Sequence, residues 1–453
     1  MPAWLRECQN QIRSNDALTD SKVQASSTSS VRSDLVRRDS NIPGLEPLLD
    51  PALLLKELSE YLDTKQVEDI KLDYLRYKPG MNCLGRYQLR VGGDTIVTHA
   101  KAHGLDATNK MSKSSERPVT DTILGPGRVL LKQQNIIFSL FPNDAKLVSL
   151  QQLGDREFRQ RMLGRVFGSH SEWNDSRVGE VLNYKPERRY VARLVRPDGE
   201  TALAKFYSKS GYARAHAISR KLNVSRNALY PETMGRSKKY AVVAYRWQPG
   251  MTLRQLNVEG RVASSDLKAT AESLAAFHAS GGHGLSQPDA FEQKNTLLAL
   301  AEQLDFLLPE LGQRAKSIAH KLSSWFVDQN PVNVPIHGDF YDKQVVIDHA
   351  KASLIDFDAA RLGNPLLDLG SYIAHLENMV SSHGVSDVDI NKQRETLITA
   401  YEDLTAGIDH GQLNRYVALG LFALIHHPFR AWVDDWPERT GELLSRVESL
   451  FDA

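Results

Sequence analysis

The sequence predicts an α+β fold, with antiparallel sheets in the first half of the chain and packed helices in the second. The first observation is an internal repeat, in which residues 75–79 (LRYKP) are echoed by residues 182–186 (LNYKP). The second is a change of pattern, since from Ser265 onward the apolar residues follow helical spacing. The composition, with 41% hydrophobic and 25% charged residues, is that of an ordinary globular protein.

Length and charge exclude several classes of protein. The 453 residues suffice for two or three domains of about 150 residues each. Lys and Arg number 56 and Asp and Glu 55, a net charge of +1 that gives no overall attraction to nucleic acid or to anionic membranes. Cys8 and Cys83 are too few for a disulfide framework or a thiolate metal site. The longest apolar run, residues 416–425, has about half of the ~20 residues that a membrane helix needs. We therefore expect a soluble cytoplasmic protein that binds neither nucleic acid nor membrane, and no oligomeric state is predicted.

The N-terminal segments differ from the rest of the chain. Residues 1–40 are expected to form a disordered tail, because the stretch ASSTSSVRSD at residues 25–34 is too polar to offset its ordering entropy. An amphipathic helix is expected over residues 52–62. The polar residues 105–118 (LDATNKMSKSSERP) are expected to form a mobile loop.

The repeat predicts two copies of a small β-sheet. In each copy an alternating stretch leads to a turn, at residues 91–94 (VGGD) or 196–199 (RPDG), and a further strand then ends in Ala-Lys, at Lys101 or Lys205. Three antiparallel strands are therefore expected in each copy. Two unrelated meanders with common turn residues would give a similar pattern, but a duplicated module is preferred.

The residues that carry chemistry lie between Pro335 and Gly370. Two short strands are expected at residues 345–348 and 353–355, with Asp339 shortly before the first and Asp356 directly after the second. Phosphoryl transfer uses one such carboxylate to accept the proton of the attacking hydroxyl and another to hold Mg²⁺ against the β- and γ-phosphates. The alternative is that His-Gly-Asp occurs here by accident and that its Asp caps a helix.

The order His337-Gly338-Asp339, Gln344 and Ile355-Asp356-Phe357 resembles the aminoglycoside phosphotransferase and choline kinase-like superfamily. The resemblance implies a bilobal protein-kinase-like fold, with a small antiparallel β lobe and a large, mainly helical lobe, preceded here by an extra N-terminal β-containing module. Gln344 replaces the commoner Asn, which is similar to the maltokinase-type sugar kinases.

The same resemblance implies roles for individual residues. Asp339 would be the catalytic base, His337 would support its loop, Gln344 and Asp356 would bind Mg²⁺, and Asp368 would be structural. Asp342 and Asp358 are expected to be solvated or to support the site, although Asp358 could join a second metal ion.

The resemblance also implies a domain order. Residues 247–253 (WQPGMTL) resemble the linker after the family's hinge. The expected parts are therefore the tail (1–40), the extra module (41–150), the β lobe (151–248) and the helical lobe with the catalytic loop (249–453).

The nucleotide site is expected in the β lobe, with Lys205 on the α- and β-phosphates of ATP. The 185–189 loop (KPERR) contains no glycine, so Lys185, Arg188 and Arg189 would neutralise phosphate charge; simple solvation of these turn residues is the alternative. The helix expected after Lys205 contains no Glu to pair with this lysine, and Glu232 is the only candidate nearby.

Near the C-terminus, His426, Asp434 and Asp435 are candidate substrate contacts. Adjacent histidines on a helix point about 100° apart, so a metal site at the His pair is disfavoured, whereas packing is an alternative for His426.

The sequence as a whole predicts an ATP- and Mg²⁺-dependent kinase that moves the γ-phosphate to a hydroxyl of a small molecule, a sugar or an amino sugar. An aminoglycoside-modifying kinase and a nucleotide-binding pseudokinase or regulatory module are the alternatives, and a protein that only binds partners is a third.

Overall fold

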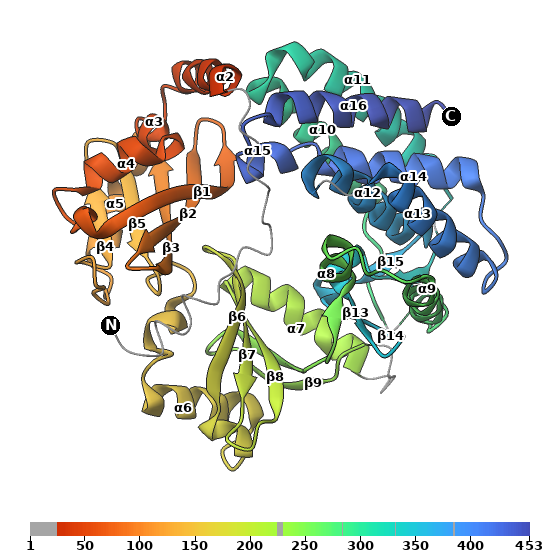
Figure 1. Ribbon diagram of the computed structural model, residues 1–453, viewed down its shortest axis with the longest axis horizontal. Helices are drawn as coiled ribbons and strands as arrows, with labels where there is room; N and C mark the ends of the chain where they lie inside the picture. The colour runs from red at the N-terminus through yellow and green to blue at the C-terminus, as the bar shows by residue number, and fades with distance from the viewer. Residues whose placement is uncertain (1–24, 224–229, 283, 331, 384–385) are drawn as a thin grey trace.

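The computed structural model describes residues 25–223, 230–282, 284–330, 332–383 and 386–453. It has three parts, which lie around a common centre in Figure 1: a first sheet with short helices, a second sheet, and a helical part that includes the C-terminus. The second sheet and the helical part form the small and large lobes of the predicted kinase-like α+β fold, and the first sheet is the extra module. The predicted fold class is confirmed.

The two large sheets have the same strand order, which confirms the predicted duplication. The first is ordered β1-β2-β3-β5-β4 and the second β6-β7-β8-β10-β9, with antiparallel pairing throughout. Each copy thus has two strands beyond the three that were predicted. The bounds are β1 Val67–Lys78, β2 Asn82–Val91, β3 Asp94–His103, β4 Arg128–Leu131, β5 Ile136–Leu140, β6 Arg177–Lys185, β7 Arg189–Val195, β8 Thr201–Tyr207, β9 Thr233–Ser237 and β10 Val242–Arg246.

The turn between β2 and β3 explains the tight hairpin of the first copy. Gly92 and Gly93 have φ values of 58° and 81°, which only glycine adopts without strain. The pairing of Val91 with Asp94 fixes the register of the two strands.

The N-terminal segments are more ordered than expected. Residues 1–24 of the expected tail lie outside the described residues, but residues 25–38 form a helix that packs on the rest of the protein, so the prediction of a tail reaching residue 40 is wrong there. Leu35 is only 1% exposed, and the Arg38 guanidinium donates to the carbonyl oxygens of Phe306 and Leu307. Burial of Leu35 and these long-range bonds offset the ordering entropy of the polar stretch.

The expected loop over residues 105–118 also contains regular structure. It forms a 3₁₀ turn and a short helix, because Met111 is buried and Arg128 donates to the carbonyl oxygen of Ser114. The helix expected over residues 52–62 is present but ends four residues early. The helices of this part are α2 Ala25–Arg38, α3 Leu45–Leu49, α4 Pro51–Leu58 and α5 Thr108–Ser115, with 3₁₀ turns at Thr64–Gln66 and Leu105–Ala107.

The second sheet has its own hydrophobic core. Aromatic rings of Phe141, Tyr184, Tyr190 and Phe206 pack against one another at centroid distances of 5.4–6.3 Å. The helices of this lobe are α6 Arg156–Phe167 and α7 Lys209–Asn223, with 3₁₀ turns at Val148–Gln152 and Glu172–Asp175.

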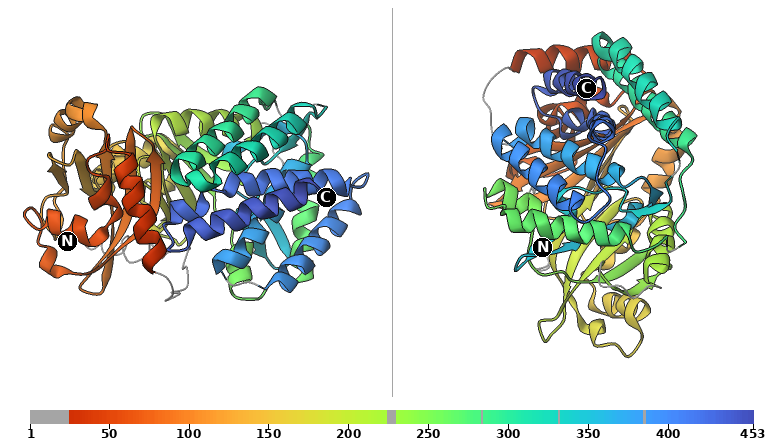
Figure 2. Two further views of the ribbon diagram at one scale, coloured as in Figure 1. Left: turned by 90° about the horizontal axis from the view of Figure 1, so that it is seen from above. Right: turned by 90° about the vertical axis from the view of Figure 1, so that its right-hand side faces the viewer.

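The helical part contains a three-stranded and a two-stranded sheet, β11-β13-β14 and β12-β15, and the catalytic loop runs between them. Its core is continuous with that of the first sheet, and the rings of Tyr77 in β1 and Phe429 in α15 lie 6.1 Å apart. Figure 2 shows the helices packed in layers beside both sheets. The bounds are β11 Met251–Thr252, α8 Leu253–Val258, α9 Ser264–His278, α10 Ala290–Leu307, α11 Pro309–Val327, β12 Val334–Ile336, β13 Val345–Asp348, β14 Lys351–Leu354, β15 Arg361–Gly363, α12 Leu366–His383, α13 Asp387–Glu402, α14 His410–Leu424, α15 His427–Ala431 and α16 Trp436–Phe451, with 3₁₀ turns at Asp342–Gln344 and Phe357–Ala359.

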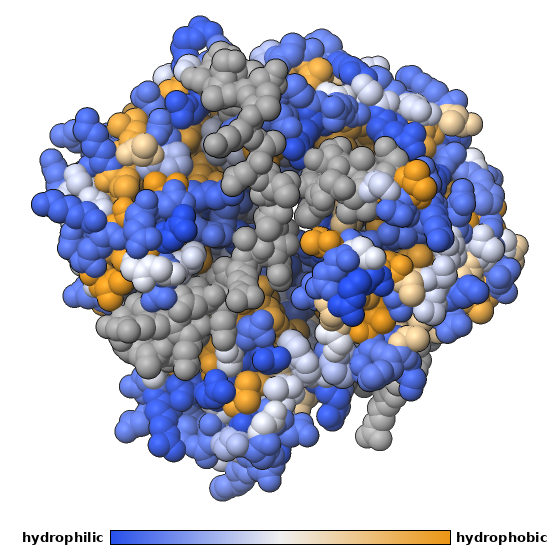
Figure 3. Space-filling model, in the orientation of Figure 1, coloured by the Kyte–Doolittle hydropathy of each residue, from blue (hydrophilic) through white to orange (hydrophobic). Residues whose placement is uncertain are grey.

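The surface in Figure 3 is mostly hydrophilic, with hydrophobic residues scattered between polar ones. None of the helices in the described ranges is long and apolar enough to cross a membrane.

Candidate active site

The catalytic loop runs from β12 to β13 and is fixed by a buried carboxylate. Asp368, at the start of α12, accepts hydrogen bonds from the backbone N–H groups of His337 at 2.6 Å and Gly338 at 2.8 Å. His278 lies 3.1 Å from the same carboxylate. Burial alone would raise the pKa of Asp368, but the hydrogen bonds from His278 and from the backbone N–H of Gly338 keep the pKa below its usual value. The structure thus places Asp368 as an anchor of the loop.

Gly338 gives the loop its sharp bend. Its φ is +79°, and a Cβ at this position would collide with the carbonyl oxygen of Ala359 and the guanidinium of Arg361. Arg361 donates to the Gly338 carbonyl oxygen at 3.1 Å. A residue with a side chain would therefore push the neighbouring Asp339 out of place.

His337 joins the loop to the strand that carries the second carboxylate. It is fully buried, and its Nε2 lies 2.8 Å from the carbonyl oxygen of Ile355. Because a carbonyl oxygen only accepts, Nε2 carries the proton, and Nδ1 accepts from the backbone N–H of Asp339 at 3.4 Å. The histidine thus ties Asp339 to the segment that leads to Asp356.

The Asp339 side chain is exposed to water but has many protein atoms around it. Partial burial raises the pKa of its carboxyl, the nearby Asp356 raises it further, and the cations Arg189 and Lys185 oppose the rise. A carboxylate that is open to solvent and faces cations can receive a hydroxyl group and accept its proton.

Asp356 follows β14 and is held by two cations from the second sheet. Its Oδ1 lies 2.6 Å from Lys205 Nζ in β8 and its Oδ2 lies 3.1 Å from Arg189 Nη1 in β7. Burial alone would raise the pKa of Asp356, but Lys205 and Arg189 outweigh it and hold the pKa well below its usual range. The residue has a left-handed φ of 64°, a strained conformation that costs on the order of 1–3 kcal/mol and is common at functional sites.

The partner of Lys205 differs from the one considered in the sequence. Glu232 pairs with Arg246 at 2.7 Å instead, and α7 contains no acidic residue. Lys205 is 4% exposed and lies 3.6 Å from Asp358 as well as beside Asp356. The Tyr207 hydroxyl donates to Asp358 at 2.8 Å, so Asp358 supports the lysine and is not a freely solvated residue.

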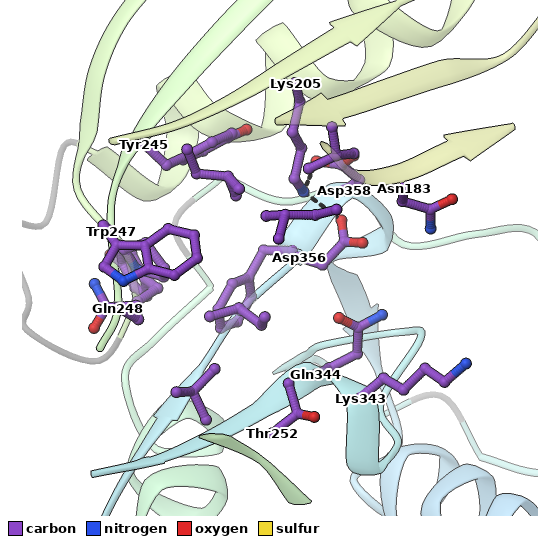
Figure 4. Close-up of a pocket in the computed structure, with 18 of the residues that line it drawn as sticks. Asn183, Lys205, Tyr245, Trp247, Gln248, Thr252, Lys343, Gln344, Asp356 and Asp358 are labelled. Carbon is purple, nitrogen blue, oxygen red and sulfur yellow. Dashed lines mark hydrogen bonds and ion pairs between the residues drawn. The ribbon is translucent and has the colours of Figure 1, made fainter. Parts of the chain in front are cut away.

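A cavity of about 590 Å³ lies between the second sheet and the strands that follow the catalytic loop. In Figure 4, Lys205 from one side and Gln344 from the other point toward Asp356, with Asp358 next to it. Such a volume suits a nucleotide or a ligand of similar size. Apolar side chains contribute to its lining, namely Leu182, Val191, Leu203, Trp247, Val346 and Ile355.

The 185–189 loop lies at the same site and carries three of the expected cations. Burial together with Arg189 lowers the pKa of Lys185 to about 8, and the negative charge of Asp339 opposes this change. Arg189 lines the cavity, whereas Arg188 is exposed and does not. The structure therefore brings Lys185, Arg189 and Lys205 together with Asp339 and Asp356.

The conformation of the loop depends on the first sheet. Glu187, 6% exposed, lies 2.7 Å from Lys101 in β3, 3.0 Å from Arg76 in β1 and 3.5 Å from Lys146. Its backbone N–H donates to Asp144 at 2.8 Å. Lys101, which corresponds to Lys205 in the repeat, thus binds a carboxylate of the loop.

Sequence reasoning missed the buried pair of Arg254 and Asp342. The guanidinium donates to the two carboxylate oxygens at 2.6 and 2.9 Å and joins α8 to the catalytic loop. Asp342 is 1% exposed, so it supports the loop and is not solvated. Only a long-range contact map could reveal this pair, since 87 residues lie between its members.

The C-terminal candidates lie away from the cavity. His426 is buried in the core with its Nε2 2.9 Å from the carbonyl oxygen of Leu300, which corrects its expected place in the cleft. Asp435 pairs with Arg439 at 2.7 Å, and Asp434 is exposed. A substrate contact of these two aspartates stays a prediction.

The oxygen-bearing residues at the cavity would suit a magnesium ion that takes its other ligands from phosphate. Asp356, Asp358 and Gln344 bring carboxylate and carboxamide oxygens to one end of the cavity, and Mg²⁺ prefers oxygen ligands. Among the described residues no group of three or more His, Cys, Asp or Glu side chains is arranged to hold a metal. Protein sites for Mg²⁺ with nucleotides commonly supply one or two carboxylates, and phosphates and water complete the shell.

A comparison with protein families assigns the part of the chain that contains this site to a known family. Residues 177–410 match the family model described as the phosphotransferase enzyme family (APH). The comparison with curated proteins gives no match.

Several solved structures are similar to part of the chain. A thermostable mutant of aminoglycoside phosphotransferase APH(4)-Ia is 15% identical, with 61% of this chain and 95% of that chain covered and a TM-score of 0.43. Choline kinase LicA from Streptococcus pneumoniae is 15% identical, with coverages of 60% and 94% and a TM-score of 0.43. A type I macrolide 2'-phosphotransferase is 16% identical, with coverages of 59% and 92% and a TM-score of 0.41.

Proposed function

The chain belongs to the phosphotransferase enzyme family and is a small-molecule kinase with a hydroxyl acceptor, and we propose that it moves the γ-phosphate of ATP to a hydroxyl of a sugar or amino sugar, with Asp339 as the base. The observation that carries the proposal is the position of Asp339. This water-accessible carboxylate lies near the charges of Arg189 and Lys185, and Arg189 lines the cavity that also contains Lys205 and Asp356.

The residues of the cavity suit the proposed nucleotide. The apolar side chains around Trp247 would enclose the base, and Lys205 and Arg189 would contact phosphate oxygens once these compete for the cations that now bind Asp356. Gln344 and Asp356 would hold Mg²⁺, which would neutralise the charge of the phosphates.

The proposed transfer needs little covalent help from the protein. The acceptor oxygen forms a bond to the γ-phosphorus while the bond to the β,γ-bridging oxygen breaks and ADP leaves. Asp339 orients the hydroxyl and receives its proton, and Lys185 stabilises the charge on the transferred group.

The test is ADP formation from ATP and Mg²⁺ over a panel of sugars, amino sugars, aminoglycosides and choline. We expect one class of acceptor to stimulate turnover and Asp339→Asn to lower kcat by about 10²-fold or more, because the variant has no proton acceptor. Asp403→Asn, at an exposed carboxylate that ends α13, is the matched control and should retain full activity.

The other outcomes would identify the alternatives. Stimulation by aminoglycosides alone would point to an antibiotic-modifying kinase. Tight binding of ATP without turnover in any mixture, equal for the native protein and for Asp339→Asn, would contradict the proposal and favour a regulatory module.

A further inference from the structure

The Lys205 side chain reaches two carboxylates of one short segment. Among the residues that the structure describes, Asp356 and Asp358 are the carboxylates at ion-pair distance from its ammonium group, at 2.6 and 3.6 Å. The lysine is only 4% exposed, and a buried ammonium group needs a partner of opposite charge. The two aspartates therefore determine the position of the lysine head group.

Asp356 cannot serve the lysine and a metal ion equally well. The proposed function assigns Asp356 and Gln344 to Mg²⁺, and the second oxygen of Asp356 already lies 3.1 Å from Arg189. An ammonium group beside a carboxylate that binds a divalent cation is repelled by the charge of that cation. Lys205 would then need another carboxylate to hold it against the phosphates. The α7 helix cannot supply one, because it contains no acidic residue.

The two oxygens of Asp358 contact two different residues of β8. Its Oδ2 accepts a hydrogen bond from the Tyr207 hydroxyl at 2.8 Å, and its Oδ1 is the atom that lies 3.6 Å from the Lys205 ammonium group. Tyr207 is 5% exposed and follows Lys205 by two residues, so both side chains lie on the same face of the strand. Asp358 is thus fixed beside the lysine by a buried hydroxyl, and its position does not depend on a metal ion.

The same groups lie at the cavity assigned to the nucleotide. Lys205, Asp356, Asp358 and Gln344 all line it. In Figure 4, Asp358 lies beside Lys205, whereas Gln344 approaches Asp356 from the opposite side. The carboxylate available to the lysine and the carboxamide available to a metal ion are therefore on different sides of Asp356.

From these contacts we infer that Asp358 is a positioning residue, which holds Lys205 toward the nucleotide phosphates while Asp356 binds Mg²⁺. The inference rests on the proposed function and adds to it a separate role for each aspartate. Without the carboxylate of Asp358, the lysine would stay bound to Asp356 and compete there with the metal ion. The affinity for a nucleotide with Mg²⁺ would then fall, and it would fall only because Lys205 is present.

The test is a double-mutant cycle on nucleotide affinity. MgADP is titrated calorimetrically into the native protein, Asp358→Asn, Lys205→Met and the double variant. Each single change should weaken MgADP binding about 10-fold, because Lys205→Met removes a phosphate contact and Asp358→Asn leaves the lysine on Asp356. In the Lys205→Met background, Asp358→Asn should change the affinity by less than about twofold, since the lysine that it positions is absent.

Two further variants separate this role from folding. Tyr207→Phe keeps the ring but removes the hydroxyl that fixes Asp358, so it should weaken MgADP binding about threefold, and only where Lys205 is present. Asp305→Asn is the matched control. It removes an Asp–Lys pair of the helical lobe, in which Asp305 lies 2.8 Å from Lys316, and should leave the affinity unchanged.

Three results would overturn the inference. If Asp358→Asn weakens MgADP binding equally with and without Lys205, Asp358 binds the metal ion or only supports the fold. If Asp358→Asn binds MgADP like the native protein while Lys205→Met does not, the lysine needs no second carboxylate. In both cases loss of ADP formation in Asp339→Asn would still support the kinase. If the native protein binds neither MgADP nor MgATP, the inference and the proposed function both fail.

Discussion

The charged groups around Asp339 set the protonation states that the proposed reaction needs. Partial burial and Asp356 raise the pKa of Asp339, and the cations Arg189 and Lys185 limit the rise. Lys185 has the opposite shift, because burial and Arg189 lower its pKa to about 8. The reaction needs Asp339 without its proton and Lys185 with its proton. Both conditions hold only over a limited range of pH.

The first prediction at this scale is a bell-shaped pH dependence of kcat/KM for ATP, which reports the free protein. Activity should fall on the acid side as Asp339 becomes protonated, at a higher pH than for an ordinary carboxyl. It should fall on the alkaline side near pH 8, as Lys185 loses its charge. Lys185→Arg should remove the alkaline fall and keep the acid one; a native profile that stays flat through pH 8 would contradict the role of Lys185.

The site residues that lie in short sequence motifs could be predicted from the sequence. His337, Asp339, Gln344 and Asp356 could be brought to one site because they flank two adjacent strands. The pairing of Lys205 with Asp356 could not be predicted, since it depends on how the second sheet sits over the catalytic strands. His426 was expected to contact substrate but is buried in the core. The sequence pattern around a helical histidine is the same whether the residue is buried in a core or lines a cleft.

At the scale of elements, the first sheet holds the loop that would cover the phosphates. Three cations of the first part converge on Glu187. Burial alone would raise its pKa, but Lys101 and Lys146 lower it to about 2. Glu187 has a φ of 59° without being glycine, so the loop is kept in a strained conformation by contacts from outside. These contacts take the place of the glycines that the loop lacks.

We therefore predict that Glu187→Gln weakens ATP binding. The change removes the charge but keeps the size, and lost charge-assisted bonds of this kind cost roughly 1–3 kcal/mol. KM for ATP should rise about 10-fold. Glu200→Gln, in the exposed turn between β7 and β8, serves as the control.

Lys101→Met should have the same effect as Glu187→Gln, although Lys101 lies in another sheet. Equal affinity for ATP in the native protein and in both variants, measured by calorimetric titration, would show that the first sheet does not position the loop.

The duplication could be predicted from the repeated LRYKP and LNYKP segments, as could three strands of each copy. The β4 and β5 strands were not predicted, because their hydrophobic pattern follows a stretch of polar residues that reads as a loop. The α2 helix was not predicted either, since its polar sequence becomes ordered through long-range contacts with α10 and through the pairing of Arg32 with Asp50.

At the scale of the whole molecule, the hydrophobic cores do not follow the order of the chain. The first sheet shares one continuous core with the helical lobe, while most of the second sheet has a separate core. The extra module is thus joined to the C-terminal helices by apolar packing. It is joined to the second sheet by the ion pairs at Glu187 and by the packing of Phe141 on Tyr184 and Tyr190.

This division predicts how the protein unfolds on heating. The first sheet and the helical lobe should melt together, because separating them would expose Tyr77 and Phe429 to water. Calorimetry of the full chain should give one transition that contains both parts. Phe429→Ala should lower the temperature of that transition, since truncating a buried Phe costs about 3–5 kcal/mol. A separate transition of the first part that is insensitive to Phe429→Ala would contradict the shared core.

The contact between Tyr77 and Phe429 also bears on how the chain is made. At about 5–20 residues per second, the roughly 350 residues between them take on the order of 20–70 s to leave the ribosome. During that time the first sheet has formed its hairpins, but the face that later meets α15 has no partner. The nascent protein therefore carries an exposed apolar surface for most of its synthesis, and a chaperone that shields such surfaces would act on this protein before its active site exists.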